Sequence, residues 1–185
     1  MERRGMTLKR LFTFILVFAL GVGLGVALTY HPAPTIPPAL YKSETYFSPN
    51  SGVALHIIKA INNTKSSVDL AIFDLTSEDI TSALEQAQKR GVKIRIIADS
   101  RQVKGHSSKI PILADDRFTI KITHGEGRGL MHNKFALFDN KLLVTGSFNW
   151  TDSAEHYNYE NAIFISDPET IKKYQQEFDK IWSAR

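Results

Sequence analysis

Two spacings of apolar residues alternate along the chain and predict an alternation of helices and strands. A three-to-four-residue spacing predicts one helix over residues 52–62 and another over 76–90. Dense apolar and β-branched stretches predict buried strands at 67–73 and 92–99. A strand, a helix and a second strand in this order are typical of a parallel βαβ unit in an α/β sheet.

The elements predicted in the C-terminal half are shorter and follow one another closely. They are a short helix at 110–116, strands at 118–123, 131–139, 141–147 and 159–166, and a final helix from 168 to 182. Asp139-Asn140 separates two of these strands and predicts a hairpin turn. The whole pattern predicts an α/β fold with a mixed, largely parallel β-sheet sandwiched by helices on both faces.

An uncharged apolar stretch, Leu11–Leu28, follows a positively charged N-terminus. About 18–20 such residues span the roughly 30 Å core of a bilayer. The positive charge before the stretch places the N-terminus in the cytoplasm and the remaining chain outside. A cleaved signal peptide, with Gly25 and Ala27 as the small residues of its cleavage site, is the alternative. Either interpretation predicts an exported protein, in the bacterial periplasm or anchored in the inner membrane.

The segment after this stretch is rich in proline and has no periodic apolar pattern, which indicates an extended linker. We therefore divide the chain into an anchor or signal peptide (residues 1–30), a linker (31–46) and one folded domain (47–185).

Composition and charge restrict the chemistry of this domain. The 185 residues include no cysteine, which excludes disulfides, thiolate catalysis and cysteine-ligated zinc. The net charge is +4, but four basic residues and one acidic residue before Leu11 account for +3 of it and leave +1. Any affinity of the domain for a polyanion must therefore come from a local patch.

Polar side chains gather around the expected hairpin. His132 and Lys134 are two residues apart, so on a strand they share a face. Ser147 and Asn149 follow the next strand, where the chain leaves the sheet. Together these side chains can attack or protonate, neutralise charge and donate hydrogen bonds, which suits an anionic oxygen cluster such as a phosphate.

The spacing of this group resembles the HKD signature of the phospholipase D superfamily. The signature appears as His132-x-Lys134, four residues, Asp139, six residues, and Gly146-Ser147-x-Asn149. The downstream YENAIF resembles the Glu-Asn strand of that family, and residues 68–102 resemble its first βαβ unit. The likeness covers roughly residues 47–185, and the Gly-Ser-x-Asn spacing favours the small single-motif subgroup of Nuc-like endonucleases and mitochondrial cardiolipin hydrolases.

The resemblance implies a phosphodiesterase that needs no metal or cofactor and works through a covalent phosphohistidine. It assigns the nucleophile to His132 and phosphate binding to Lys134, Ser147 and Asn149. It also assigns to Glu160 a hydrogen bond from the second ring nitrogen of His132, which fixes the tautomer. Asp139 faces away from His132 by strand parity, so we expect it to be a scaffold residue of the motif.

The chain carries one such motif, because none of its other five histidines is followed by lysine two positions later. In the family, the nucleophile and the acid that protonates the leaving oxygen are histidines from two motifs. The resemblance therefore implies a homodimer in which two chains share one site around a twofold axis.

Other polar residues are weaker candidates for the site. Asp99, Arg101 and Gln102 end a strand at the edge where α/β sheets bind ligands, Lys104 and Arg128 are candidates for contact with a phosphate backbone, and Trp150 either stacks on a base or packs in the core. His106, His124 and His156 are interpreted as loop histidines rather than zinc ligands.

DNA or RNA, cleaved by an endonuclease reaction, is the substrate that the sequence favours. A membrane phospholipid such as cardiolipin is the alternative substrate, favoured if the Leu11–Leu28 anchor is uncleaved. A catalytically inactive nucleic-acid-binding dimer is the alternative from another class.

Overall fold

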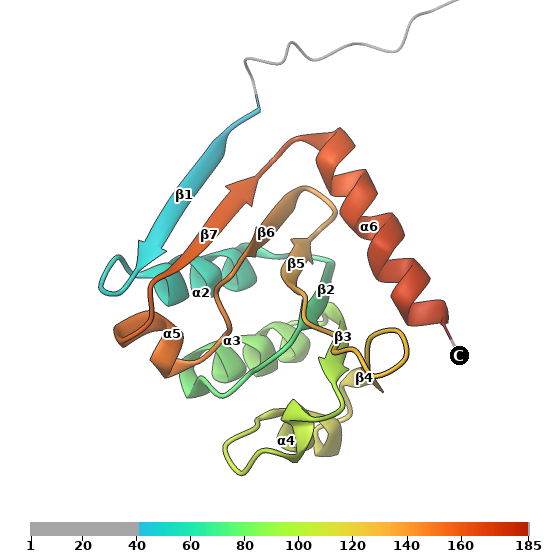
Figure 1. The fold of residues 1–185 in the computed structure, drawn as a ribbon. Coiled ribbons are helices and arrows are strands. Elements are labelled where there is room, and N and C mark those ends of the chain that lie inside the picture. The colour runs from blue at the N-terminus through green and yellow to red at the C-terminus, as the bar shows by residue number, and fades with distance from the viewer. Residues whose placement is uncertain (1–40, 185) are drawn as a thin grey trace, which may run out of the picture. The chain divides into compact units, whose positions relative to one another are not determined.

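A seven-stranded β-sheet organises residues 41–184, the part of the chain that the computed structural model describes (Figure 1). The strand order is β1-β7-β6-β5-β2-β3-β4. The strands are β1 (Ser43–Ser48), β2 (Ser67–Ile72), β3 (Lys93–Asp99), β4 (Thr119–Thr123), β5 (Lys134–Phe138), β6 (Leu142–Gly146) and β7 (Glu160–Ile165). The helices are α2 (Val53–Asn63), α3 (Glu78–Lys89), α4 (Ile110–Asp115), α5 (Asp152–His156) and α6 (Pro168–Ser183), with a short 3₁₀ helix η2 (Gln102–Lys104).

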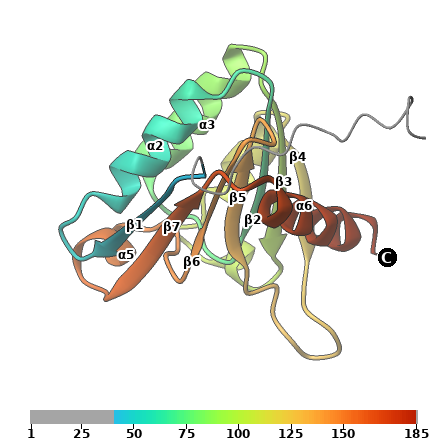
Figure 2. The ribbon, with the colours of Figure 1, turned by 90° about the horizontal axis from the view of Figure 1, so that it is seen from above.

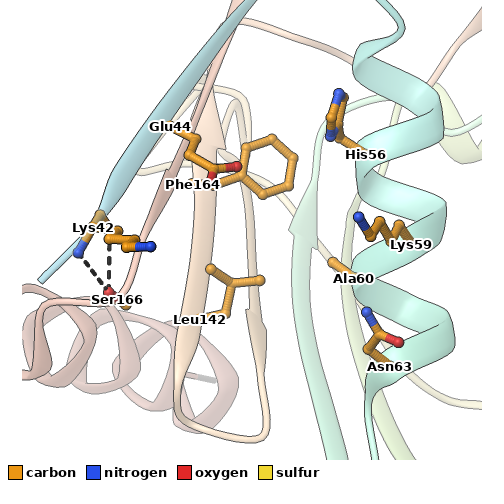
Figure 3. A pocket seen from close by; sticks show the side chains of 9 residues that line it. All are labelled: Lys42, Glu44, His56, Lys59, Ala60, Asn63, Leu142, Phe164 and Ser166. Atoms are coloured by element: carbon orange, nitrogen blue, oxygen red, sulfur yellow. Dashed lines mark hydrogen bonds between the residues drawn. The ribbon is translucent and has the colours of Figure 1, made fainter.

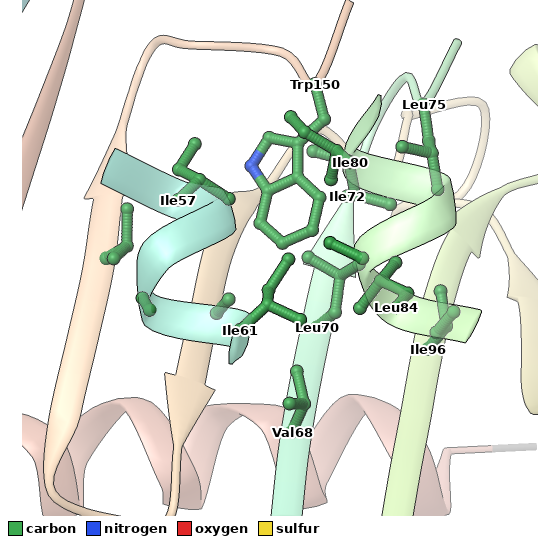
Figure 4. Close-up of a cluster of buried hydrophobic side chains, with 14 of the residues drawn as sticks. Ile57, Ile61, Val68, Leu70, Ile72, Leu75, Ile80, Leu84, Ile96 and Trp150 are labelled. Carbon is green, nitrogen blue, oxygen red and sulfur yellow. The ribbon is translucent and has the colours of Figure 1, made fainter. Parts of the chain in front are cut away.

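Helices cover both faces of the sheet, as the sequence predicts. Helices α2 and α3 lie on one face and α6 lies on the other (Figure 2). Successive side chains of a strand point to opposite faces and so pack under different helices. Leu70 and Ile72 of β2 belong to the cluster under α2 and α3, whereas Ala71 belongs to the cluster under α6. Trp150 lies between α2 and α3 (Figure 4) and is 2% exposed, so its core interpretation is confirmed and it offers no surface to a base.

The sheet is mixed, but parallel pairs are the minority among the described strands. Strands β2, β3 and β4 pair in parallel, and the other four pairs are antiparallel. The expectation of a largely parallel sheet is therefore wrong. Parallel neighbours need a long crossover, and the segments carrying α3 and α4 supply those of the two parallel pairs. Strands β5 and β6 are joined by the Asp139-Asn140 turn, whose positive φ angles of 51° and 53° are those of a tight hairpin.

Strand β1 begins at Ser43, inside the range 31–46 that the sequence assigns to the linker. It pairs antiparallel with β7 at the edge of the sheet. Most of its side chains are exposed, so it carries little of the alternating pattern that reveals a strand. The Leu11–Leu28 segment lies outside the described residues. Within residues 41–184, no helix is both long and apolar enough to cross a membrane.

Candidate active site

The candidate site lies at the edge of the sheet where β2, β3 and β6 end and where β5 and β7 begin. Lys134, the first residue of β5, pairs with Ile72 at the end of β2. Gly146, the last residue of β6, pairs with Ala162 near the start of β7. The strand order therefore brings the residues after β2, before β5, after β6 and at the start of β7 to one edge.

His132 and Lys134 are in contact, although β5 begins three residues later than expected and His132 precedes it. The Lys134 ammonium donates to the His132 carbonyl oxygen at 2.9 Å and lies 3.2 Å from Nδ1 of the imidazole. The Phe73 ring packs against the imidazole, with 4.4 Å between ring centroids, and lies 4.7 Å from the lysine ammonium. The pair thus shares an aromatic support at the end of β2.

Asp99 anchors the segment that leads to His132. Its side chain is fully buried, and Oδ2 accepts a hydrogen bond from the Met131 amide at 2.9 Å. Its Oδ1 accepts hydrogen bonds from the Arg101 and Gln102 amides at 2.9 and 3.2 Å. Because all of its contacts are to backbone amides, Asp99 positions the chain before His132.

Glu160 has partners other than the expected one. Its carboxylate accepts hydrogen bonds from the Ser147 hydroxyl and, at 3.2 Å, from the side-chain amide of Asn158. Within residues 41–184, no hydrogen bond joins Glu160 to His132. Strand β6 lies between β7 and β5, so Ser147 at the end of β6 lies closer to Glu160 than His132 does. Its hydroxyl donates to the Glu160 carboxylate. The predicted Glu160–His132 hydrogen bond is therefore absent from the described chain.

Gly146 allows Ser147 to reach this position. A Cβ atom at Gly146, whose φ is 156°, would lie 2.1 Å from the Asn161 carbonyl oxygen. The same close approach lets the Asn161 amide donate to the Ser147 hydroxyl oxygen at 3.1 Å. The glycine of the motif is therefore required by backbone contact between β6 and β7.

Asn149 lies half-buried just beyond Ser147. Its Oδ1 atom is buried and has no hydrogen-bond partner among the described residues. The following residue, Trp150, is bonded on both sides to the segment after β2: its amide donates to the Asp74 carbonyl at 3.1 Å, and its carbonyl accepts from the Thr76 amide at 3.0 Å. Asn149 thus has a fixed backbone, and its buried side-chain oxygen lacks a hydrogen-bond donor among the described residues.

Two carboxylates tune the charge of Lys134. Burial lowers the pKa of Lys134, and the negative charges of Glu160 and Asp74 partly oppose that shift. Burial in turn raises the pKa of Asp74, against the Leu75 amide and the Lys134 charge, which lower it. The sequence analysis missed Asp74. The signal was present, because β2 is followed by Phe-Asp just as β3 ends in Ala-Asp.

Asp139 lies at the other end of β5 and serves as a scaffold residue, as expected. Its carboxylate accepts hydrogen bonds from three consecutive amides, those of Lys65, Ser66 and Ser67, at 2.8, 2.7 and 3.0 Å, and from the Ser66 hydroxyl at 2.7 Å. Burial raises its pKa, but these hydrogen bonds outweigh burial and lower the pKa to about 2. Asp139 therefore ties the β5–β6 turn to the loop that enters β2.

The weaker candidates gather less closely. A groove of about 530 Å³ runs beside His132, between the glycine-rich loop with His124 and the C-terminal part of α6 with Lys180. Arg101 donates from its guanidinium to the Arg128 carbonyl at 3.1 Å. Across residues 41–184, no cluster of three or more histidine, cysteine or carboxylate side chains is arranged to hold a metal ion.

Comparisons with known proteins agree on one family. The family model described as "Cardiolipin synthase, PLD-like domain" matches residues 57–182. The chain is 31% identical to a mitochondrial cardiolipin hydrolase of Mus musculus, over 81% of this chain and 67% of that protein. It is 31% identical to a phospholipase D of Rickettsia bellii, over 96% of both chains.

A solved structure gives the same result. The chain resembles Nuc of Salmonella typhimurium, a phospholipase D family member, with a TM-score of 0.70 and 29% identity over 77% of this chain and 94% of that one. The chain spans between 49% and 67% of the length of the mouse, dog, Chlamydomonas and human cardiolipin hydrolases that it matches.

Proposed function

The chain belongs to the phospholipase D superfamily, and from that premise we propose that it is a metal-independent endonuclease that cleaves DNA or RNA through a phosphohistidine. The observation that carries this proposal is the contact between the exposed His132 imidazole and the half-buried Lys134 ammonium at the sheet edge. A nucleophile beside a fixed positive charge suits attack on a phosphodiester.

The proposed reaction has two displacements. A nitrogen of His132 attacks phosphorus, and the P–O bond to the leaving strand breaks. A second histidine protonates the departing oxygen. That histidine then removes a proton from water, which attacks the phosphohistidine, breaks the P–N bond and releases the phosphate end. Lys134 balances the charge that grows on the phosphoryl oxygens, and in this proposal the side-chain nitrogen of Asn149, which follows β6 at the same edge of the sheet, donates a hydrogen bond to them.

Glu160 has a different role in this proposal from the one that the resemblance implies. Its carboxylate holds the Ser147 hydroxyl and contributes negative charge near Lys134. We therefore assign Glu160 to positioning Ser147 and to keeping Lys134 charged, rather than to orienting His132.

The second histidine comes from a second copy of the chain in this proposal. One motif per chain supplies one His132, so a homodimer with a shared site completes the acid–base pair. Exposed apolar side chains near the same edge support an interface there: Tyr157 and Tyr159 are 79% and 93% exposed, and Tyr159 directly precedes Glu160.

A phospholipid is the second candidate substrate. Relatives named cardiolipin hydrolase and phospholipase D favour it, and the small net charge after residue 10 removes the strong positive field that tight duplex binding needs. Both substrates present the same phosphodiester to His132, so the chemistry above applies to either.

In the deciding experiment, the full-length protein is incubated separately with plasmid DNA, single-stranded DNA, RNA and cardiolipin, each in the presence of EDTA. We expect nucleic-acid cleavage that His132→Ala abolishes and that the matched loop variant His106→Ala retains. Cardiolipin hydrolysis without nucleic-acid cleavage would contradict the nuclease proposal and support the lipid hydrolase. Binding without hydrolysis of any substrate would indicate the inactive nucleic-acid-binding dimer.

A further inference from the structure

A second cavity, drawn in Figure 3, lies at the ends of the strands that are opposite to those near His132. It has a volume of about 380 Å³ and opens between α2 and the strands β1, β6 and β7. Leu142 begins β6 and Ser166 follows β7, so the cavity occupies the ends of these strands that are remote from Ser147 and Glu160. Nothing in the proposed reaction uses it.

The floor and one wall of this cavity are apolar. Leu142, Phe164 and Ala60 line it from β6, β7 and α2. The His56 ring stacks on Tyr46, with 3.7 Å between ring centroids, and meets Phe164 edge-on at 6.1 Å. These contacts hold the rings in place, so the wall is formed before a ligand arrives.

Two lysines give the cavity its charge. Lys42 extends toward it from the start of β1, and Lys59 extends toward it from α2 (Figure 3). Neither takes part in an ion pair among residues 41–184. The one acidic residue that lines the cavity, Glu44, accepts a hydrogen bond from the Tyr46 hydroxyl at 2.9 Å. Two lysines and one glutamate leave a formal charge of +1, which matches a single negative charge.

We propose that this cavity binds the head group of an anionic phospholipid, a phosphodiester with one negative charge. The ammonium groups of Lys42 and Lys59 meet the phosphate, and the first carbons of the acyl chains lie on Leu142 and Phe164. A volume of about 380 Å³ is at the small end of ligand pockets, so it holds the head group and the first acyl carbons and leaves the rest of the chains outside.

The place of the cavity in the chain favours a lipid over a soluble phosphate. Lys42 lies 14 residues after the apolar segment Leu11–Leu28, which the sequence predicts to be an anchor or signal. Inorganic phosphate has no apolar part and would leave the apolar floor beside the cationic groups without a contact. The inference goes beyond the proposed function, since it needs neither a nuclease nor a lipid hydrolase.

The test measures binding of three probes to the full chain in a neutral detergent. The chain carries His132→Ala, so that no probe is consumed. The probes are a short-chain phosphatidylglycerol, a phosphatidylcholine with the same chains, and inorganic phosphate. We expect phosphatidylglycerol to bind most tightly, and its affinity to fall about tenfold with Lys59→Gln and about tenfold with Lys42→Gln, the usual effect of losing one charged hydrogen bond. The exposed α6 variant Lys172→Gln is the matched control and should bind as the parent does.

Three results would overturn the proposal. They are equal affinity for phosphatidylcholine, equal affinity for inorganic phosphate, and phosphatidylglycerol binding that neither Lys42→Gln nor Lys59→Gln weakens. Thermal unfolding of each variant confirms that the fold is intact. With His132 restored, the lysine variants should cleave the enzyme's substrate at the parent rate, so a failure of this proposal is distinguishable from a failure of the proposed function.

Discussion

Lys134 is half-buried near two carboxylates, and this environment sets the pH range over which it carries a charge. Burial lowers the pKa of Lys134, while Glu160 and Asp74 raise it. A lysine that binds phosphate works only in its protonated form. Asp74, a residue outside the HKD signature, therefore helps to keep Lys134 protonated.

Asp74→Asn should lower the pKa of Lys134. The substitution removes a negative charge that raises the pKa of Lys134, so the lysine loses its proton at a lower pH than in the parent. An NMR titration of the Lys134 side chain measures the shift, and Asp115→Asn on α4, an exposed residue outside the site, is the control. An unchanged or higher pKa of Lys134 would contradict the coupling of Asp74 to Lys134.

Individual contacts in the site were less predictable than the residue types. The sequence identifies His132, Lys134, Ser147 and Asn149 by spacing, and the structure brings them to one edge. Within one chain, the Glu160 carboxylate bonds to Ser147 rather than to His132, because β6 lies between β7 and β5 and spacing along the chain does not encode strand order. Asp74 was missed although its position just after β2 parallels that of Asp99 at the end of β3.

At the scale of elements, the close approach of the antiparallel strands β6 and β7 depends on the absence of a side chain at Gly146. The strands approach so closely there that a Cβ would lie 2.1 Å from the Asn161 carbonyl oxygen. The end of β6, which carries Ser147, can therefore keep its position only with glycine before it.

Gly146→Ala should reduce both stability and activity. Relief of the clash pushes β6 away from β7 and separates Ser147 from Glu160, at a cost of about 3 kcal/mol in the free energy of unfolding. Gly127→Ala is the matched control, since its Cβ would meet nothing within 4 Å and its φ of 59° costs only about 1 kcal/mol. Urea denaturation and the cleavage rate measure the two effects. Full activity in Gly146→Ala would disprove the role of this contact.

The β5–β6 turn also contributes to the stability of the fold, because Asp139 binds the loop before β2. Asp139→Asn should lower the free energy of unfolding at pH 7 by about 2 kcal/mol, the scale of hydrogen bonds to a charged group. The pKa of Asp139 is lowered to about 2, so its contribution is complete above about pH 4 and is lost as the pH falls through 2.

The variant and the parent should therefore differ in stability at pH 7 and converge near pH 2. Urea denaturation at both pH values tests this, with the exposed Asp116→Asn as control. A difference that persists at pH 2 would show that the carboxylate charge is not responsible.

Elements with strong periodicity were predicted closely, and those without it were not. The final helix was expected at 168–182 and spans Pro168–Ser183, because Ile171 and Phe178 carry a clear apolar face. Strand β1 escaped prediction since its residues are mostly exposed. The share of parallel pairs was overestimated because one βαβ unit was extended to the whole sheet.

At the scale of the whole molecule, a shared site predicts how mixtures of chains behave. His132→Ala removes the nucleophile from one chain and the acid from its partner, so a mixed dimer has one crippled site. After joint unfolding and refolding, activity should follow the square of the wild-type fraction, and an equal mixture should keep roughly a quarter of the rate. Independent sites would keep about half, and a straight line would end the dimer proposal.

Placement of the chain is a second prediction at this scale, and it concerns Leu11–Leu28. We propose that the segment is an uncleaved anchor with the catalytic domain outside the cytoplasm. The full-length protein should then stay in the membrane fraction after a carbonate wash, with its mass unchanged. A soluble product that begins near Leu28 would show that the segment is a signal peptide.

The exposure of His132 has a consequence for how this fold diverges over time. The imidazole rests on Phe73 at the surface, while the burial that stabilises the sheet belongs to other residues. Replacement of the histidine removes the chemistry and leaves the packing intact. A gene lineage can therefore lose its catalyst in one step, keep a sound scaffold, and put that scaffold to other uses. A catalytically inactive relative with the same fold can therefore arise from a single substitution.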